Sequence, residues 1–70
     1  MKNRLEEKRL QKGWTQQELA DRVMVSRQTI NSLERGRYNP SITLAFRLAR
    51  QFDAPIEDLF LYSETEDANE

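Results

Sequence analysis

The sequence has no cysteine and no histidine, and it has only two glycines and two prolines among its 70 residues. Without cysteine it can form neither a disulfide framework nor a thiolate metal site, which fits the reducing cytoplasm. Without histidine it lacks the commonest general base and metal ligand. No segment approaches the ~18 consecutive apolar residues of a membrane span, and no signal peptide is evident. We therefore expect neither an enzyme nor a membrane protein, and no metal, cofactor or small-molecule ligand.

The charge is distributed unevenly along the chain. The chain itself is long enough for one small domain with a single core. Residues 1–50 contain all eleven basic residues and five acidic ones, whereas residues 51–70 contain seven acidic residues and no basic one. The net charge of −1 thus hides a basic part of charge +6 and an acidic part of charge −7. This asymmetry is typical of a nucleic-acid-binding body with an acidic tail, although an unevenly charged solvated surface would look the same.

Helix-capping residues and apolar spacing predict an all-α fold. Asn3 with Glu6, and Thr15 with Glu18, have the spacing of a capping box. The expected helices occupy residues 3–12, 15–23, 26–35, 41–52 and 55–60. The fourth has the longest apolar face, formed by Ile42, Leu44, Ala45, Leu48, Ala49 and Phe52. The aromatic residues Trp14, Phe46, Phe52 and Phe60 are expected in the core or at its edge.

The end of the chain differs in composition from the rest. Leu61 and Tyr62 could add a short extended segment after the last helix. Residues 63–70 are polar and acidic, with no apolar residue larger than Ala68, and we expect them to be disordered. The sequence therefore predicts one domain over residues 1–62, followed by an acidic tail over residues 63–70.

The most informative segment is TQQELADRVMVSRQTINSLERG, residues 15–36. It predicts two short helices separated by a few residues around Met24 and Val25, with the small Ala20 where the helices approach each other. This arrangement describes a helix-turn-helix, whose second helix can lie in the major groove of DNA, about 12 Å wide. Arginine pairs with guanine and glutamine with adenine, so a polar exposed face on that helix suits base recognition.

Over residues 3–61 the sequence resembles the Cro/CI-type (Xre) family of bacterial and phage repressors. The motifs that carry the resemblance are TQQELA (15–20), VSRQTINSLERG (25–36), YNPS (38–41), LAFRLARQF (44–52) and IEDLF (56–60). The resemblance implies a compact five-helix, lambda-repressor-like domain. It also implies a sequence-specific regulator of transcription, a repressor, that binds a palindromic operator in double-stranded DNA as a homodimer.

Two positions depart from the family pattern. Met24 occupies a turn position that is usually glycine, because the backbone there favours positive φ. A methionine in that conformation costs about 1 kcal/mol, unless the turn is slightly rearranged. Ala54 stands where a capping serine or threonine is common before the last helix.

The resemblance also assigns roles to individual residues. The expected base contacts are Arg27, Gln28 and Ser32, with Thr29 and Asn31 at the edge of the interface or on phosphate. The expected contacts to the DNA backbone are Gln16, Arg37, Tyr38, Asn39 and Ser41. Gln16 would in addition brace Gln28, and Tyr38 could equally be a packed structural residue. Arg9 and Glu34 are expected to form a structural salt bridge that sets the height of the recognition helix.

The C-terminal apolar residues suggest how a dimer would form. Leu59, Phe60, Leu61 and Tyr62 offer more apolar surface than a short helix needs for its own domain, so we expect a dimer interface there. The alternative is that all four pack internally. A second function would also fit the acidic tail, namely that of an antitoxin-like DNA-binding protein whose main partner is another protein.

Overall fold

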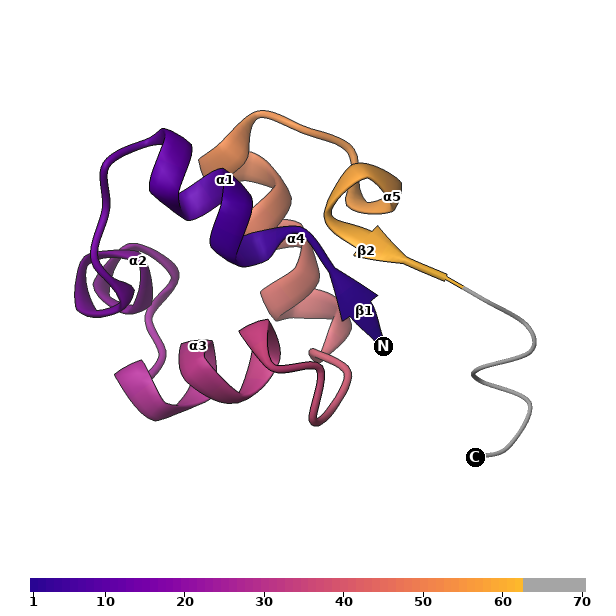
Figure 1. Ribbon diagram of the computed structural model, residues 1–70, viewed down its shortest axis with the longest axis horizontal. Helices are drawn as coiled ribbons and strands as arrows, with labels where there is room; N and C mark the ends of the chain where they lie inside the picture. Colours follow the sequence, from indigo (N-terminus) through magenta and orange to yellow (C-terminus); the bar gives the residue numbers. More distant parts are fainter. Residues whose placement is uncertain (63–70) are drawn as a thin grey trace.

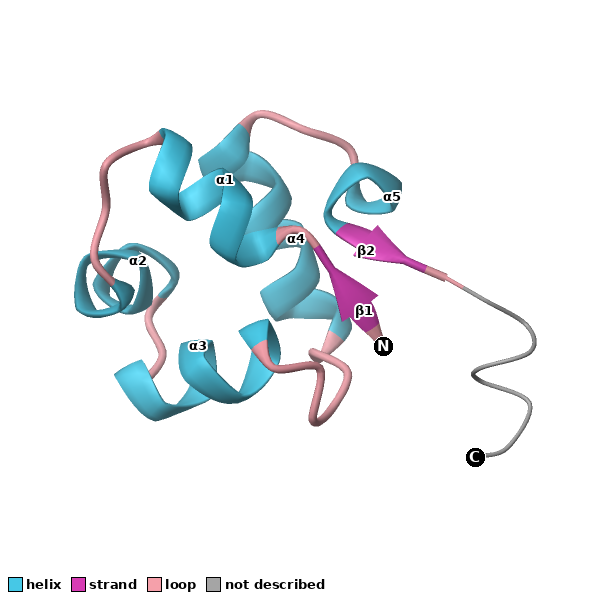
Figure 2. Ribbon diagram, viewed as in Figure 1, coloured by secondary structure: helices cyan, strands magenta, loops and turns pink. Residues whose placement is uncertain are grey.

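The computed structural model describes residues 1–62 and confirms the all-α fold. Its helices are α1 (Leu5–Gln11), α2 (Gln16–Val23), α3 (Arg27–Glu34), α4 (Ile42–Phe52) and α5 (Ile56–Leu59). Two short strands, β1 (Lys2–Asn3) and β2 (Phe60–Leu61), form an antiparallel pair at one side of the helices (Figures 1 and 2). The predicted acidic tail, residues 63–70, lies outside the described residues. None of the helices in residues 1–62 is long and apolar enough to cross a membrane.

Side-chain caps fix the start of the three central helices. The Thr15 hydroxyl oxygen accepts a hydrogen bond from the Glu18 amide at 3.0 Å, and the Glu18 carboxylate accepts one from the Thr15 amide at 3.0 Å. This is the predicted capping box. Ser26 and Ser41 cap α3 and α4 in the same manner, each accepting a bond from a backbone amide three residues later, at 3.1 Å in both cases. These helices therefore start where local sequence predicts.

The first and last helices differ from the prediction because the two strands lie beside them. Asn3 lies in β1, and α1 begins at Leu5 with Arg4 at the cap position. The Asn3 side chain accepts from the Leu5 amide at 3.1 Å, but from one position before the cap. At the other end α5 is a single turn, and Phe60 belongs to β2. Lys2 pairs with Leu61 and Asn3 with Phe60, so the strand pairing keeps both segments extended.

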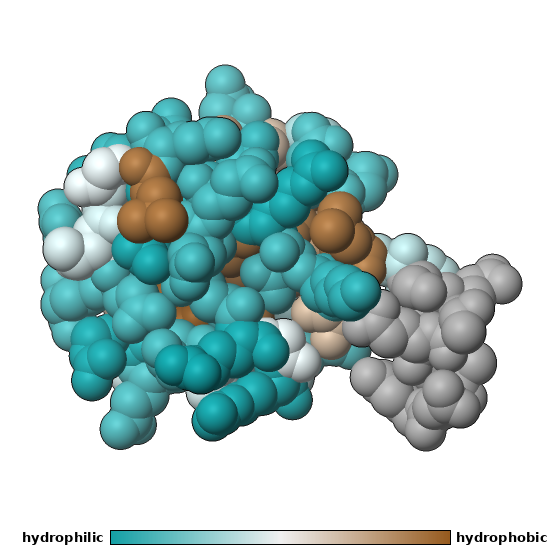
Figure 3. All heavy atoms as spheres, viewed as in Figure 1, coloured by the Kyte–Doolittle hydropathy of each residue, from teal (hydrophilic) through white to brown (hydrophobic). Residues whose placement is uncertain are grey.

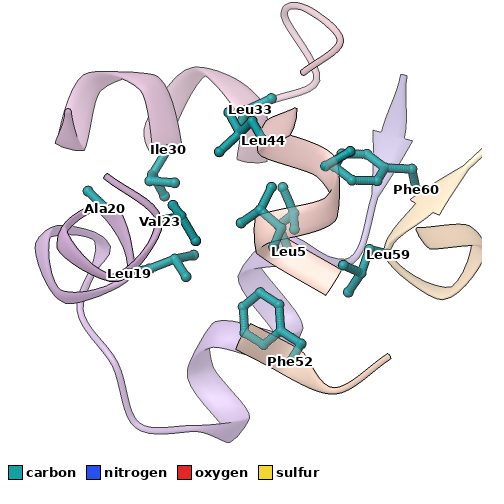
Figure 4. Close-up of a cluster of buried hydrophobic side chains, with 12 residues drawn as sticks. Leu5, Leu19, Ala20, Val23, Ile30, Leu33, Leu44, Phe52, Leu59 and Phe60 are labelled. Carbon is teal, nitrogen blue, oxygen red and sulfur yellow. The ribbon is translucent and has the colours of Figure 1, made fainter. Parts of the chain in front are cut away.

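One apolar core joins all five helices (Figure 4). The largest fully buried side chains are Leu5, Leu19, Val23, Ile30, Leu33, Leu48 and Leu59. Trp14 packs against this core, with its ring centroid 5.6 Å from that of Phe52. Two apolar residues of α4 do not join it, since Ile42 is 73 % and Phe46 54 % exposed. Each is two residues from Leu44, and at about 100° per residue this turns it away from the direction in which Leu44 points.

The turn between α2 and α3 has the conformation that the sequence predicts. Met24 is left-handed, with φ 61° and ψ 45°, and the amide that follows it donates to the Ala20 carbonyl at 3.0 Å. Asp53 ends α4 in a similar conformation, with φ 50° and ψ 48°. Residues 1–62 thus contain two non-glycine residues with positive φ, a backbone region in which a Cβ is sterically unfavourable.

Candidate nucleic-acid interface

The helices α2 and α3 pack against each other through buried apolar residues on both. Leu19, Ala20 and Val23 of α2 are fully buried, as are Ile30 and Leu33 of α3. The three residues between the helices allow only a sharp change of direction, and α3 consequently lies along the lower edge of the molecule (Figure 1). That edge is mainly hydrophilic in the space-filling view (Figure 3). The outer face of α3 is therefore a polar surface carried by a helix whose inner face is fixed in the core.

The outer face of α3 brings together most of the predicted base-contacting residues. Arg27 and Gln28 are exposed, and neither side chain has a hydrogen-bond partner within residues 1–62. A shallow depression of about 370 Å³ is lined by Arg27, Gln28, Asn31, Ser32 and Arg37. It is formed by two turns of α3 and the loop that follows. The depression thus offers guanidinium, carboxamide and hydroxyl groups on one continuous surface.

Two of the predicted base contacts also have partners inside the helix. The Thr29 hydroxyl lies 3.0 Å from the Ser26 hydroxyl, next to the helix cap, and Thr29 does not line the depression. The Asn31 side-chain oxygen accepts a bond from Arg35 Nε at 3.1 Å, which leaves its amide hydrogens to donate elsewhere. Arg35 was not among the predicted site residues, although its position one helical turn after Asn31 is a signal for this contact.

The predicted DNA-backbone contacts lie on both sides of α3. Arg37, Tyr38, Asn39 and Ser41 form an exposed loop after α3, and the Tyr38 side chain is 42 % exposed. The Ser41 hydroxyl oxygen is engaged as the cap of α4, but its hydrogen can still donate. Gln16 lies at the first position of α2, where a backbone N–H has no carbonyl partner in its own helix.

The structure gives Gln16 a different partner from the one expected. Its side-chain amide donates to Glu34 Oε1 at 3.1 Å. Glu34 offers a buried carboxylate, and a carboxylate is a stronger acceptor than the neutral amide of an exposed glutamine. Gln16 therefore joins a network at the C-terminal end of α3, and its contact with Gln28 stays a prediction.

The centre of that network is the predicted salt bridge. Arg9 Nε donates to Glu34 Oε2 at 2.7 Å, and a second guanidinium nitrogen donates to Oε1 at 3.2 Å. The third donates to the Trp14 carbonyl at 2.9 Å. The two side chains are only 10 % and 2 % exposed, and the hydrogen bond to Glu34 raises the pKa of the Arg9 guanidinium above its ordinary value. The pair holds α3 against α1 with its polar groups satisfied.

The predicted dimer residues divide into two groups. Leu59 is fully buried and Phe60 is only 7 % exposed, so both belong to the core of the domain and offer no surface to a partner. Successive residues of a strand point to opposite sides, which turns Phe60 inward and leaves Leu61 37 % exposed. Tyr62 is 68 % exposed. The interface prediction is therefore corrected for Leu59 and Phe60, and it stays a prediction for Leu61 and Tyr62.

Two helices joined by a tight left-handed turn, with a polar face on the second, define a helix-turn-helix domain. The family model described as "Helix-turn-helix" matches residues 5–59, and the chain belongs to this family of DNA-binding regulators, which are not enzymes. The resemblance to the Cro/CI type is thereby confirmed.

Small regulators of matching length are similar to this chain. An uncharacterized HTH-type transcriptional regulator of Archaeoglobus fulgidus is 52 % identical over 66 residues, which are 94 % of each chain. A regulator so described from Methanocaldococcus jannaschii is 47 % identical over 94 % of this chain and 100 % of its own. The crystal structure of the restriction-modification controller protein C.AhdI from Aeromonas hydrophila superposes with a TM-score of 0.73. It is 35 % identical and covers 81 % of this chain and 86 % of its own.

Proposed function

We propose that the protein is a sequence-specific regulator of transcription that places α3 in the major groove of double-stranded DNA. The observation that carries this proposal is the pair Arg27 and Gln28, adjacent on the first turn of α3, exposed, and without a partner in the described chain. A bidentate arginine reads guanine and a bidentate glutamine reads adenine, so two side chains with unused donors and acceptors suit direct readout. Ser32 and Asn31 extend the same face by one turn.

The surroundings of α3 fit contacts to the DNA backbone on both sides of the groove. The loop after α3 supplies the cation of Arg37, the hydroxyl of Tyr38 and the amide of Asn39, all exposed. On the other side, the backbone N–H groups at the start of α2 suit a phosphate oxygen, since they carry partial positive charge. Phosphate contacts of this kind fix the register of a protein on DNA and leave the choice of sequence to the base contacts.

A homodimer would read a palindromic operator. Leu61 and Tyr62 leave an apolar surface beside the strand pair, on which a second copy would pack by two-fold symmetry. Such a dimer would place its two α3 helices about 34 Å apart, on successive turns of one DNA face. We propose repression as the outcome, because a small domain bound at a promoter blocks access by occupancy alone. Its place of action would be the cytoplasm, where the DNA lies in archaea and bacteria, the organisms of its relatives.

Selection of bound sequences from a random pool of double-stranded DNA tests this proposal directly. We expect two inverted half-sites whose centres are about 10–10.5 base pairs apart. Arg27→Ala should then relax the preference at one position in each half-site. Arg50→Ala is the matched control, because Arg50 is also an exposed helical arginine but lies at the C-terminal end of α4, beside Asp53 and Ala54. Selection of no sequence at all, or equal effects of both substitutions, would contradict the proposed docking of α3.

A further inference from the structure

The N-terminal segment, residues 1–4, lies between the strand β2 and the C-terminal end of α3 (Figure 1). On one side Lys2 pairs with Leu61, and the Arg4 amide donates to the Leu59 carbonyl at 2.8 Å. On the other side the Met1 nitrogen donates to the Gly36 carbonyl at 3.3 Å. The segment is therefore bonded to two parts of the chain that are remote in sequence.

Asn3 makes the shortest of these connections, and both ends of its amide are used. Its Nδ2 donates to the carbonyl oxygen of Leu33, in the last turn of α3, at 2.7 Å. Its Oδ1 accepts from the Leu5 amide at 3.1 Å, which orients the amide group and joins it to the start of α1. The Leu33 carbonyl also accepts from the Gly36 amide at 2.9 Å, so Asn3 adds to the end of α3 a bond that comes from outside the helix and its own turn.

The contact between the N-terminal segment and the end of α3 is close. Gly36 has φ +71°, and a Cβ added there would lie 3.0 Å from the carbonyl oxygen of Met1. Backbone cannot withdraw as a flexible side chain can, so the glycine is needed both for the turn and for this approach. This close contact between Met1 and Gly36 shows that the N-terminal segment packs directly against the end of α3.

We propose that Asn3 is a positioning residue for DNA recognition, which fixes the orientation of α3 relative to the strand pair. This inference rests on the proposed function, because Leu61 of β2 lies on the surface where the second copy would pack. The Arg9–Glu34 pair joins α3 to α1, whereas Asn3 joins α3 to the strand pair; the two bonds run to different elements. Loss of the Asn3 bond therefore frees α3 to turn relative to the dimer surface while the salt bridge keeps it attached.

The consequence concerns the distance between the two recognition helices of a dimer. Arg27 and Gln28 lie at the opposite end of α3 from Leu33, and an eight-residue helix is about 12 Å long. A small rotation of α3 about its C-terminal end thus moves the side chains of Arg27 and Gln28 further than it moves the Leu33 carbonyl. Asn3 would restrict the protein to one separation of half-sites, and a protein without this bond would accept several.

The test compares Asn3→Asp with the wild type on the selected operator and on operators with one base pair added or removed between the half-sites. Aspartate has nearly the same shape and keeps the acceptor for Leu5, but it cannot donate to Leu33. We expect affinity for the selected operator to fall by up to about tenfold, because DNA binding would then have to hold α3 in the orientation that this intramolecular hydrogen bond fixes in the wild type. Affinity for the operators with altered spacing should fall less. The difference in affinity between the selected spacing and the altered spacings should therefore become smaller or disappear. Affinity for a single half-site should not change.

Lys2→Ala is the matched control, because Lys2 is exposed on the same strand and has no side-chain partner within residues 1–62. If Asn3→Asp destabilises the folded protein too far for DNA binding to be measured, Asn3→Ala serves instead. It removes the bond to Leu33 without placing a charge near the Leu33 carbonyl. An equal loss at every spacing and on the half-site would show a merely structural role and overturn the proposal. So would an unchanged preference for spacing. A wild type that shows no spacing preference would instead contradict the proposed dimeric function itself.

Discussion

The two ends of the helix α3 differ in how they are held. At its C-terminal end, Glu34 is bonded to Arg9 and Gln16, and the Leu33 carbonyl to Asn3. At its N-terminal end, Arg27 and Gln28 have no partner within residues 1–62. Within one short helix, therefore, the polar groups that stabilise the fold are separated from those available to a ligand. Substitutions at the C-terminal end should lower the free energy of unfolding, and those of Arg27 and Gln28 should lower DNA affinity alone.

Arg9→Met tests how the C-terminal end of α3 is bonded, and it should have the largest effect on the free energy of unfolding. It leaves the Glu34 carboxylate buried with Gln16 as its remaining side-chain donor, and breaking a buried pair on one side costs about 3–5 kcal/mol. Chemical denaturation followed by circular dichroism measures this loss. The penalty should be constant between about pH 7 and pH 10. Because the hydrogen bond to Glu34 raises the pKa of Arg9, the stabilisation is present below the pKa of the unfolded chain and is lost only at more alkaline pH.

The double variant Arg9→Met/Glu34→Leu is the control for that experiment. It removes both charges, so no unpaired ion stays buried, and it should be more stable than Arg9→Met alone. If Arg9→Met cost less than about 1 kcal/mol, which is typical of an exposed pair, the pair would not hold α3 as the structure implies. The contrast between the two ends of the helix would then be lost.

Gln28→Ala tests the N-terminal end of α3, and Arg37→Ala tests the loop after α3; both should have smaller effects, on DNA binding, and none is expected on unfolding. Gln28→Ala should cost about 1–3 kcal/mol on the selected operator and relax the preference at one base position. Arg37→Ala should weaken selected and random DNA more evenly and reduce the salt dependence of binding by about one phosphate contact. Fluorescence anisotropy at several salt concentrations measures both quantities.

Gln17→Ala provides the comparison for Gln28→Ala. Gln17 is an exposed glutamine of α2 whose amide donates to Asp21 at 2.8 Å within the same helix. Its removal should change neither the sequence preference nor the affinity by more than a few-fold. If Gln28→Ala bound every DNA sequence as tightly as the wild type does, the N-terminal end of α3 would not be the surface that contacts the bases.

Local sequence signals predict the parts of this structure that depend on neighbouring residues. The capping box of Thr15 and Glu18, the serine caps of α3 and α4, and the left-handed Met24 each involve residues a few positions apart. The Arg9–Glu34 bridge joins distant residues and was predicted through the family resemblance. At these positions a short-range rule or a family motif covers the residues concerned, and the prediction agrees with the structure.

Features that depend on distant pairing could not be predicted in this way. Asn3 has the spacing of a helix cap, but its pairing with Phe60 places it in a strand, and no local pattern signals that partner. Gln16 had several possible acceptors, and only the packing of α1, α2 and α3 determines that Glu34 is the one. Leu59 and Phe60 were assigned to an interface because the amount of core that α5 would bury is not evident from the chain.

The smallest effect is expected in the turn at Met24, which leads to the N-terminal end of α3. A substitution there distinguishes most clearly between an effect on folding and an effect on DNA recognition. Met24→Gly should stabilise the protein by about 1 kcal/mol, because glycine adopts positive φ without the steric cost that methionine incurs. Met24 is 69 % exposed, so little packing is lost. In a domain of this size, such a gain raises the midpoint of thermal unfolding by about 4–8 °C. Asp53→Gly, at the other left-handed residue, should gain less, because aspartate tolerates this region better. If Met24→Gly also altered the selected DNA sequence, the turn would help to orient Arg27 and Gln28. An unchanged sequence would show that the packed inner face and the C-terminal bonds are sufficient to position them.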